Sequence, residues 1–260
     1  MLILVVKCGI MKDLFAAQRN KPFFLVLIRL VVMVLLAAVT YSVLRFAGMS
    51  NDFPPLDMLY FPFVNIVCGV VIWRQFRQYG VSVWEYLGFE GRRLGRDIAW
   101  GLLWLFVSYI PLAIALMASM YFMFGADMFS HFEQVFAKSV PQLPDGVLPV
   151  MSIFGAFVFL VNAPIEEIVY RGWLQKGLAG RSGVTIAILV QGLLFGLQHM
   201  MFAGDVRGMV IYAFMFLAWG VTAGVIVHHQ RRLAPMVISH WIVNIIFGVG
   251  PMLAIGFVGM

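Results

Sequence analysis

Long apolar runs separated by short polar gaps make up most of the chain. Seven of these runs approach the roughly 20 residues that span a bilayer: Pro22 to Phe46, Met58 to Trp73, Ile98 to Phe124, Val147 to Leu174, Val184 to Phe202, Met209 to Val227 and Ala234 to Phe257. Apolar runs of this length are typical of helices rather than strands. The pattern therefore predicts an all-α fold, a polytopic transmembrane helical bundle of about seven spans.

The gaps between the runs contain no internal repeat, no low-complexity tract and no long linker. Such features would mark a repeat architecture or a boundary between domains. We therefore expect a cytoplasmic N-terminal tail over residues 1–21 and a single transmembrane bundle over residues 22–260.

Composition agrees with a membrane location. The chain is 62% hydrophobic and 12% charged, and its mean hydropathy is +0.94, whereas soluble domains carry about 25% charged residues. An ordinary soluble domain is excluded, and an integral, multi-pass protein surrounded by membrane lipids is expected. The net charge of +6 does not indicate nucleic-acid binding, because the basic residues fall in short clusters between apolar runs.

The basic clusters occupy alternate gaps, as they do when Lys and Arg collect in the cytoplasmic loops. They comprise Lys12, Arg19 and Lys21, then Arg74, Arg77, Arg92, Arg93 and Arg96, then Lys176 and Arg181, and finally Arg231 and Arg232. Arg45 is an exception to this alternation. The distribution predicts a cytoplasmic N-terminus and, with seven spans, an external C-terminus. We expect the bacterial inner membrane as the location.

The two cysteines, Cys8 and Cys68, are far apart in the chain and indicate neither a disulfide framework nor a thiolate metal site. The first ten residues are too short to span a membrane and lack a signal-peptide cleavage pattern. We interpret Met11 as the native start, with Met1 as the alternative.

Ionisable residues stand out against this apolar background. Glu166 and Glu167 are adjacent within a predicted span, where a carboxylate costs a few kcal/mol and is by default a functional-site hypothesis. Three further pairs are spaced four residues apart, and thus share a helix face: Glu167 with Arg171, Phe195 with His199, and His240 with Asn244. Counting about 1.5 Å per helical residue, these groups can lie at similar depths in three different spans.

These residue types suit the hydrolysis of an amide bond by an activated water. A carboxylate removed from water is a competent general base, and a neutral histidine can orient the same water, which fits Glu166 and His199. A histidine and an asparagine one turn apart can stabilise an oxyanion, which fits His240 and Asn244.

The motifs Glu-Glu-x-x-x-Arg, Phe-x-x-x-His and His-x-x-x-Asn, in this order over Ala156 to Phe247, resemble those of the CPBP family. This family comprises CAAX prenyl proteases and bacterial Abi-type proteins linked to bacteriocin processing and self-immunity. The resemblance implies an intramembrane endopeptidase whose catalytic core lies at about residues 150–250. It implies a cavity that opens to the cytoplasm and to lipid, and a peptide or membrane-protein substrate reached by those routes.

Carried over by residue, the resemblance implies that Glu166 and His199 activate the water while His240 and Asn244 form the oxyanion hole. Glu167 and Arg171 would support the site as an intrahelical pair. No cofactor is expected. The alternative is a zinc-dependent form in which Glu166, His199 and His240 bind the metal. Against zinc, the sequence lacks a His-Glu-x-x-His helix and Asn is a poor zinc ligand.

Alternatives from other functional classes remain. Carboxylates and histidines inside a bundle also serve transporters, although these often contain two related halves and the chain shows no repeat. A non-catalytic membrane scaffold or immunity factor is a further alternative. We interpret Phe195 as packing, Gly192 with Gly196 and Gly220 with Gly224 as close helix contacts, and Arg29 as a residue that snorkels to the headgroups.

Overall fold

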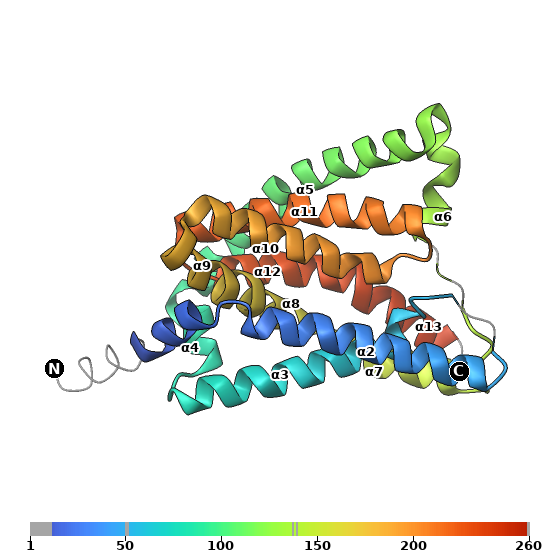
Figure 1. The fold of residues 1–260 in the computed structure, drawn as a ribbon, viewed down its shortest axis with the longest axis horizontal. Helices are drawn as coiled ribbons and strands as arrows, with labels where there is room; N and C mark the ends of the chain where they lie inside the picture. The colour runs from blue at the N-terminus through green and yellow to red at the C-terminus, as the bar shows by residue number, and fades with distance from the viewer. Residues whose placement is uncertain (1–11, 50–51, 137, 139, 259–260) are drawn as a thin grey trace.

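The structure is a computed structural model that describes residues 12–49, 52–136, 138 and 140–258. Every regular element in this part of the chain is a helix, and the longer helices run side by side (Figure 1). The predicted all-α, polytopic bundle is therefore confirmed. Cys8 and the choice between Met1 and Met11 as the start lie outside the described residues.

The α-helices are α2 (Phe24–Phe46), α3 (Phe61–Gln78), α4 (Val83–Leu87), α5 (Leu94–Phe124), α6 (Phe132–Phe136), α7 (Val147–Phe159), α8 (Asn162–Glu166), α9 (Lys176–Ser182), α10 (Val184–His199), α11 (Val206–Gln230), α12 (Ala234–Asn244) and α13 (Gly250–Val258). Two π-helices, η4 (Glu167–Gln175) and η6 (Ile245–Val249), continue α8 and α12. Short 3-10 turns are η1 (Asp57–Leu59), η2 (Gly91–Arg93), η3 (Gly125–His131) and η5 (Met200–Phe202).

Five helical segments in the described residues are long and apolar enough to cross a membrane: Phe24–Phe46, Val83–Phe136, Val184–Phe202, Val206–Gln230 and Ala234–Phe257. A sixth is obtained if the bent pair Val147–Phe159 and Asn162–Ser182 forms one span. The remaining predicted span corresponds to α3, whose last turns contain Arg74 and Arg77. The count of seven stays a prediction, as does the side on which the N-terminus lies.

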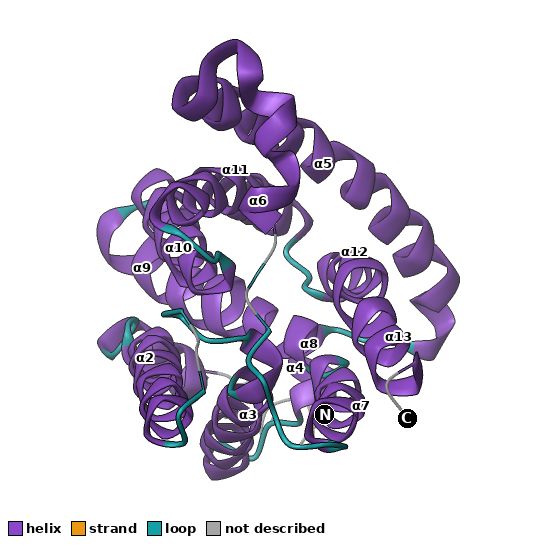
Figure 2. Cartoon of the chain, turned by 90° about the vertical axis from the view of Figure 1, so that its right-hand side faces the viewer, coloured by secondary structure: helices purple, strands orange, loops and turns teal. Residues whose placement is uncertain are grey.

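The bent segment carries the two adjacent glutamates. Its parts meet at an angle of 51°, just before Asn162. Pro164 lies in the first turn of α8, where its missing N–H is tolerated. From Glu167 the backbone continues as a π-helix, a winding that often marks functional sites. Viewed along the bundle, α8 lies near its centre, between α3, α10 and α12 (Figure 2).

Glycines allow α10 and α11 to approach closely, as predicted. A Cβ on Gly192 would press on Val221 and Gly220, and a Cβ on Gly196 would collide with backbone atoms of Ala213 and Leu217. Small residues at such crossings give helices their van der Waals contact in lipid. α10 therefore lies against α11 along its length and cannot move sideways without losing this contact.

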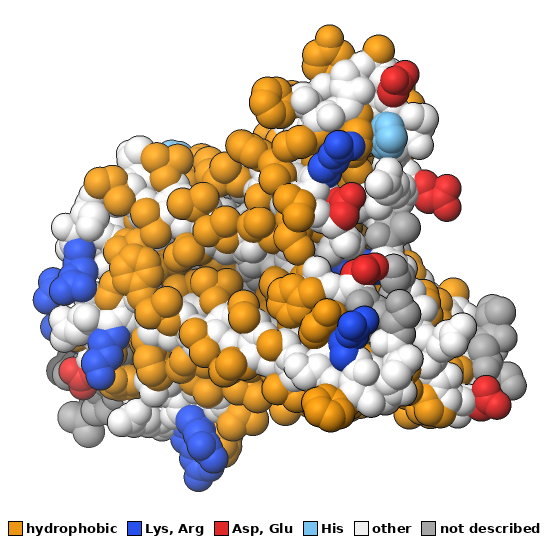
Figure 3. Space-filling model, turned by 45° about the vertical axis from the view of Figure 1, so that its right-hand side comes forward, with side chains coloured by type: hydrophobic (Ala, Val, Ile, Leu, Met, Phe, Trp, Pro, Cys, Tyr) orange, Lys and Arg blue, Asp and Glu red, His pale blue; other side chains and the backbone are white. Residues whose placement is uncertain are grey.

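The surface matches a membrane-embedded bundle. Hydrophobic side chains cover the middle of the molecule, while most Lys and Arg side chains gather toward one end and acidic ones mainly toward the other (Figure 3). Phe106 and Phe122 are 74% and 84% exposed, which lipid tolerates and water would penalise.

Candidate active site

Two adjacent carboxylates bracket one histidine in the interior. Glu166 ends α8 and Glu167 begins η4, and both side chains are buried. Oε2 of Glu166 lies 3.3 Å from Nε2 of His240, and Oε1 of Glu167 lies 3.0 Å from Nδ1 of the same ring. α12 thus brings His240 to the glutamates.

Glu167 and Arg171 form the expected ion pair on one face of η4. Arg171 Nη1 donates to Glu167 Oε1 at 3.1 Å, and both side chains are inaccessible to solvent. The guanidinium also lies 4.3 Å from the centre of the Phe195 ring, a distance at which a cation is attracted to the ring face. Phe195 therefore packs against the pair, which agrees with its interpretation as a packing residue.

Phe195 also orients His199, through its backbone. His199 Nδ1 lies 2.7 Å from the Phe195 carbonyl oxygen, and its ring stacks on Phe216 with centroids 3.6 Å apart and planes 14° apart. Because a carbonyl only accepts hydrogen bonds, Nδ1 carries the proton and Nε2 is left as an acceptor. His199 is near enough to Glu166 to interact with it electrostatically.

Asn244 ends α12, one turn beyond His240, and is buried. Its Nδ2 atom has no hydrogen-bond partner among the described residues, and the same is true of Glu166 Oε2. Buried polar atoms are usually paired, so unpaired ones indicate where a ligand or water binds. The structure thus brings Glu166, Glu167, Arg171 and His240 into direct contact. Among the described residues, no hydrogen bond joins His199 or Asn244 to these four.

Arg29 was predicted wrongly. It does not snorkel to the headgroups but is fully buried, with Nη2 2.6 Å from Glu166 Oε1. A guanidinium buried in the bundle without a counter-ion would be strongly destabilising, and Glu166 supplies that counter-ion.

Neutral polar side chains from α3, α8 and α10 complete this cluster. Arg29 Nη1 donates to Asn65, Nη2 also donates to Asn162, and Nε donates to Gln198. Gln198 in turn donates to Glu166 Oε1 at 2.6 Å. The sequence analysis gave no site role to Arg29, Asn65, Asn162 or Gln198. The sequence does offer one signal for them, because one cation and three amide side chains lie within apolar runs.

A metal ion does not fit this arrangement. No group of three or more His, Cys, Asp or Glu side chains in the described residues is placed to hold one. Glu166 Oε1 is already bound by Arg29 and Gln198. We therefore derive no step that passes through zinc.

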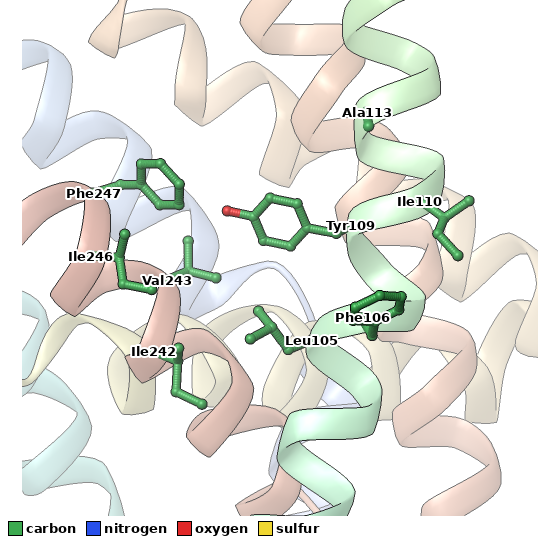
Figure 4. Close-up of a pocket in the computed structure, with 9 residues that line it drawn as sticks. All are labelled: Leu105, Phe106, Tyr109, Ile110, Ala113, Ile242, Val243, Ile246 and Phe247. Carbon is green, nitrogen blue, oxygen red and sulfur yellow. The ribbon is translucent and has the colours of Figure 1, made fainter.

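A separate apolar pocket of about 520 Å³ lies between α5 and the α12–η6 segment. It is lined by Leu105, Phe106, Tyr109, Ile110, Ala113, Ile242, Val243, Ile246 and Phe247, and Tyr109 points across it toward Phe247 (Figure 4). No predicted site residue lines this pocket. It therefore belongs to the hydrocarbon-facing part of the bundle and not to the polar cluster.

The fold and the cluster define the class of the protein: a multi-pass membrane protein with a buried carboxylate–histidine centre. Residues 149–246 match the family model described as Type II CAAX prenyl endopeptidase Rce1-like. The resemblance inferred from the motifs is confirmed, and the class is that of a CAAX-type membrane protease, a hydrolase. Searches of curated proteins and of solved structures gave no match.

Proposed function

We propose that this protein is an intramembrane endopeptidase that hydrolyses peptide bonds of membrane-associated or lipid-anchored substrates with a water activated by Glu166 and His199. The observation that carries the proposal is the asymmetry of Glu166. Its Oε1 accepts two hydrogen bonds, whereas its buried Oε2 accepts none from the described residues and faces His240. The family match supports protease activity, and the mechanism is our proposal.

In the first step a water molecule transfers a proton to Glu166 Oε2 as its oxygen attacks the carbonyl carbon of the substrate. His199 orients this water through Nε2, the nitrogen that its hydrogen bond to Phe195 leaves free. The C–N bond then breaks, and the proton held by Glu166 moves to the leaving amine. The products are a carboxylic acid and an amine, which become a carboxylate and an ammonium group when the second proton of the water passes from the acid to the amine, and Glu166 returns to its ionised form.

His240 and Asn244 would stabilise the oxyanion of the tetrahedral intermediate. Asn244 offers its unpaired Nδ2, a donor one helical turn from His240. His240 donates Nδ1–H to Glu167, so it donates to the oxyanion only when Nε2 is protonated as well.

The substrate we propose is a peptide or membrane protein that reaches the site from the cytoplasm or from the surrounding lipid. No cofactor takes part in the proposed reaction, and nucleic acid is not a partner. The proposed location is a bacterial inner membrane. These proposals follow from the distribution of charge along the chain and from the family match over residues 149–246.

The experiment that tests the function compares protein termini in the membranes of cells that express the native chain or Glu166→Gln. The matched control is Glu133→Gln, which removes an exposed carboxylate from α6. We expect new termini with the native chain and the control, and their loss with Glu166→Gln at equal expression. Identical termini in all three would reject the protease and favour a scaffold or a transporter.

A further inference from the structure

We propose that Arg29 is a positioning residue of the active site. It holds Glu166 as a carboxylate and occupies its Oε1 atom, so that Oε2 is the oxygen left to receive the proton of the attacking water. The proposal rests on the proposed function. It assigns a role to α2, which lies outside the segment matched by the family model.

The hydrogen bonds of Arg29 fix its position from several helical segments. Nε donates to Gln198 Oε1 at 2.5 Å, and Nη1 donates to Asn65 Oδ1 at 3.1 Å. Nη2 donates both to Asn162 Oδ1 at 2.9 Å and to Glu166 Oε1 at 2.6 Å. A guanidinium has five N–H groups in one plane, and these four bonds use most of them. The orientation of Arg29 is therefore determined by its surroundings before any substrate binds.

The hydrogen bonds of Gln198 also fix its orientation, and they determine which atom of its amide group faces Glu166. Its Oε1 accepts from Arg29 Nε and from the Tyr170 hydroxyl, the latter at 2.8 Å. With the oxygen so placed, the amide nitrogen points at Glu166 Oε1 and donates to it at 2.6 Å. Two donors thus converge on Oε1, and the carboxylate cannot rotate to exchange its oxygens without breaking both bonds.

Each of the two glutamates is paired with one arginine. Arginine stays protonated in proteins, and a fully buried cation without a counter-ion is strongly destabilising. Glu166 is the acidic side chain that contacts Arg29 in the described residues, while Glu167 is paired with Arg171. Arg29 therefore favours the ionised form of Glu166, which is the form that can act as a base.

This arrangement separates two tasks that a single carboxylate performs. Oε1 anchors the group through Arg29 and Gln198, and Oε2 remains available next to His240. An asparagine or glutamine in place of Arg29 could still donate a hydrogen bond, but it would supply no charge. The positioning role thus predicts that lysine replaces Arg29 better than glutamine does.

The test uses purified full-length protein in lipid nanodiscs and the variants Arg29→Gln and Arg29→Lys. Arg45→Gln is the matched control, because Arg45 lies on the same helix and is exposed. Infrared difference spectra against Glu166→Gln in each background report whether Glu166 is ionised. At neutral pH we expect a carboxylate in the native chain, in Arg29→Lys and in the control, and a protonated carboxyl group in Arg29→Gln.

The yield of Glu166-dependent termini gives the second readout. We expect a loss of about 10-fold or more in Arg29→Gln, partial recovery in Arg29→Lys and no change in Arg45→Gln. If Arg29→Gln does not fold, Arg29→Lys and the double variant Arg29→Gln/Glu166→Gln, which removes both charges, carry the test. In that case the double variant should fold where Arg29→Gln does not, because it leaves no unpaired buried charge.

The outcomes separate this inference from the proposed function. A Glu166 that stays ionised in Arg29→Gln, or a loss of termini as large in Arg45→Gln, overturns the role of Arg29 even where proteolysis is established. Spectra that change as expected, in a native chain that yields no Glu166-dependent termini, overturn the protease proposal and with it the catalytic purpose of this ion pair.

Discussion

Nδ1 of His240 lies 3.0 Å from Oε1 of Glu167, the residue next to Glu166. Because a carboxylate accepts hydrogen bonds and does not donate them, this contact places a proton on Nδ1 and turns Nε2 toward the Oε2 atom of Glu166. Glu167 is itself held by Arg171. The orientation of the histidine therefore depends on an ion pair that does not touch the proposed water.

We expect Glu167→Gln to lower activity by about 10- to 1,000-fold, because the amide supplies neither the charge nor the fixed acceptor that holds His240. The yield of Glu166-dependent termini measures the loss. Glu90→Gln is the control, since Glu90 forms an exposed ion pair with Arg93 on the same chain. An equal loss in both variants would mean that Glu167 acts only through general stability.

Asn244→Ala should lower activity by about 100- to 1,000-fold, the usual cost of removing an oxyanion donor. Thermal unfolding should change little, because Nδ2 has no partner among the described residues. Single-turnover rates at saturating substrate are the measurement. A variant that keeps its rate but binds substrate more weakly would assign Asn244 to substrate binding and not to the oxyanion hole.

Gly196→Ala should destabilise the bundle by about 1–3 kcal/mol, the range for an overpacked contact. The added methyl group would meet backbone atoms of Ala213 and Leu217, which cannot move independently of α11. Gly95→Ala in α5 is the matched control, since no atom lies within 4 Å of a Cβ at that position. Thermal unfolding in detergent should show a lower transition temperature for the first variant and an equal or higher one for the second.

Removal of metal ions should leave activity within about twofold, because the described residues offer no group of three metal-ligating side chains. The measurement is the rate of substrate cleavage before and after prolonged treatment with a chelator in metal-free buffer. A loss of activity that added zinc restores would reject the metal-free mechanism.

Lys138 lies outside the membrane-spanning segments, and its titration should make the stability of the protein depend on pH. Burial lowers the pKa of Lys138 to about 8, although Asp57 opposes the shift. In the unfolded chain Lys138 has its ordinary pKa of 10.5. Between about pH 8 and 10.5 the unfolded chain therefore binds more protons than the folded chain. The free energy of unfolding should therefore rise as the pH increases from about 8 to 10.5.

The Lys138→Met variant isolates this contribution. It removes the titrating ammonium group, which donates to the carbonyl oxygens of Pro55 and Met201. The difference in transition temperature between the native chain and the variant should change over the same pH interval. A constant difference would show that Lys138 titrates alike in both states.

The sequence predicted helices well and atomic contacts poorly, for physical reasons. Apolar length placed α2, α10 and α11 to within a few residues, because burial in lipid leaves few other structures possible. Spacing of four predicted the pair of Glu167 with Arg171, since it is local to one helix. The partner of Arg29 could not be predicted in this way, because Glu166 lies in another helix and only the assembled bundle brings them together.

The π-helical winding from Glu167 to Gln175 was likewise not predicted. Helical periodicity in a sequence reports which face is apolar, and over nine residues it does not distinguish a π-helix from an α-helix. Two of the pairs named from spacing, Glu167 with Arg171 and Phe195 with His199, are in contact, while the direction in which each side chain points required the structure.

Because Arg29 lies on α2, the segment of residues 149–246 depends on a helix outside it. A fragment restricted to residues 149–246 would contain Glu166, Glu167, His199 and His240 but would lack the cation that neutralises Glu166. Grafting that segment into another helical bundle would bury an uncompensated anion. The segment matched by the family model is therefore not an independent unit, and a transplant would need α2 as well.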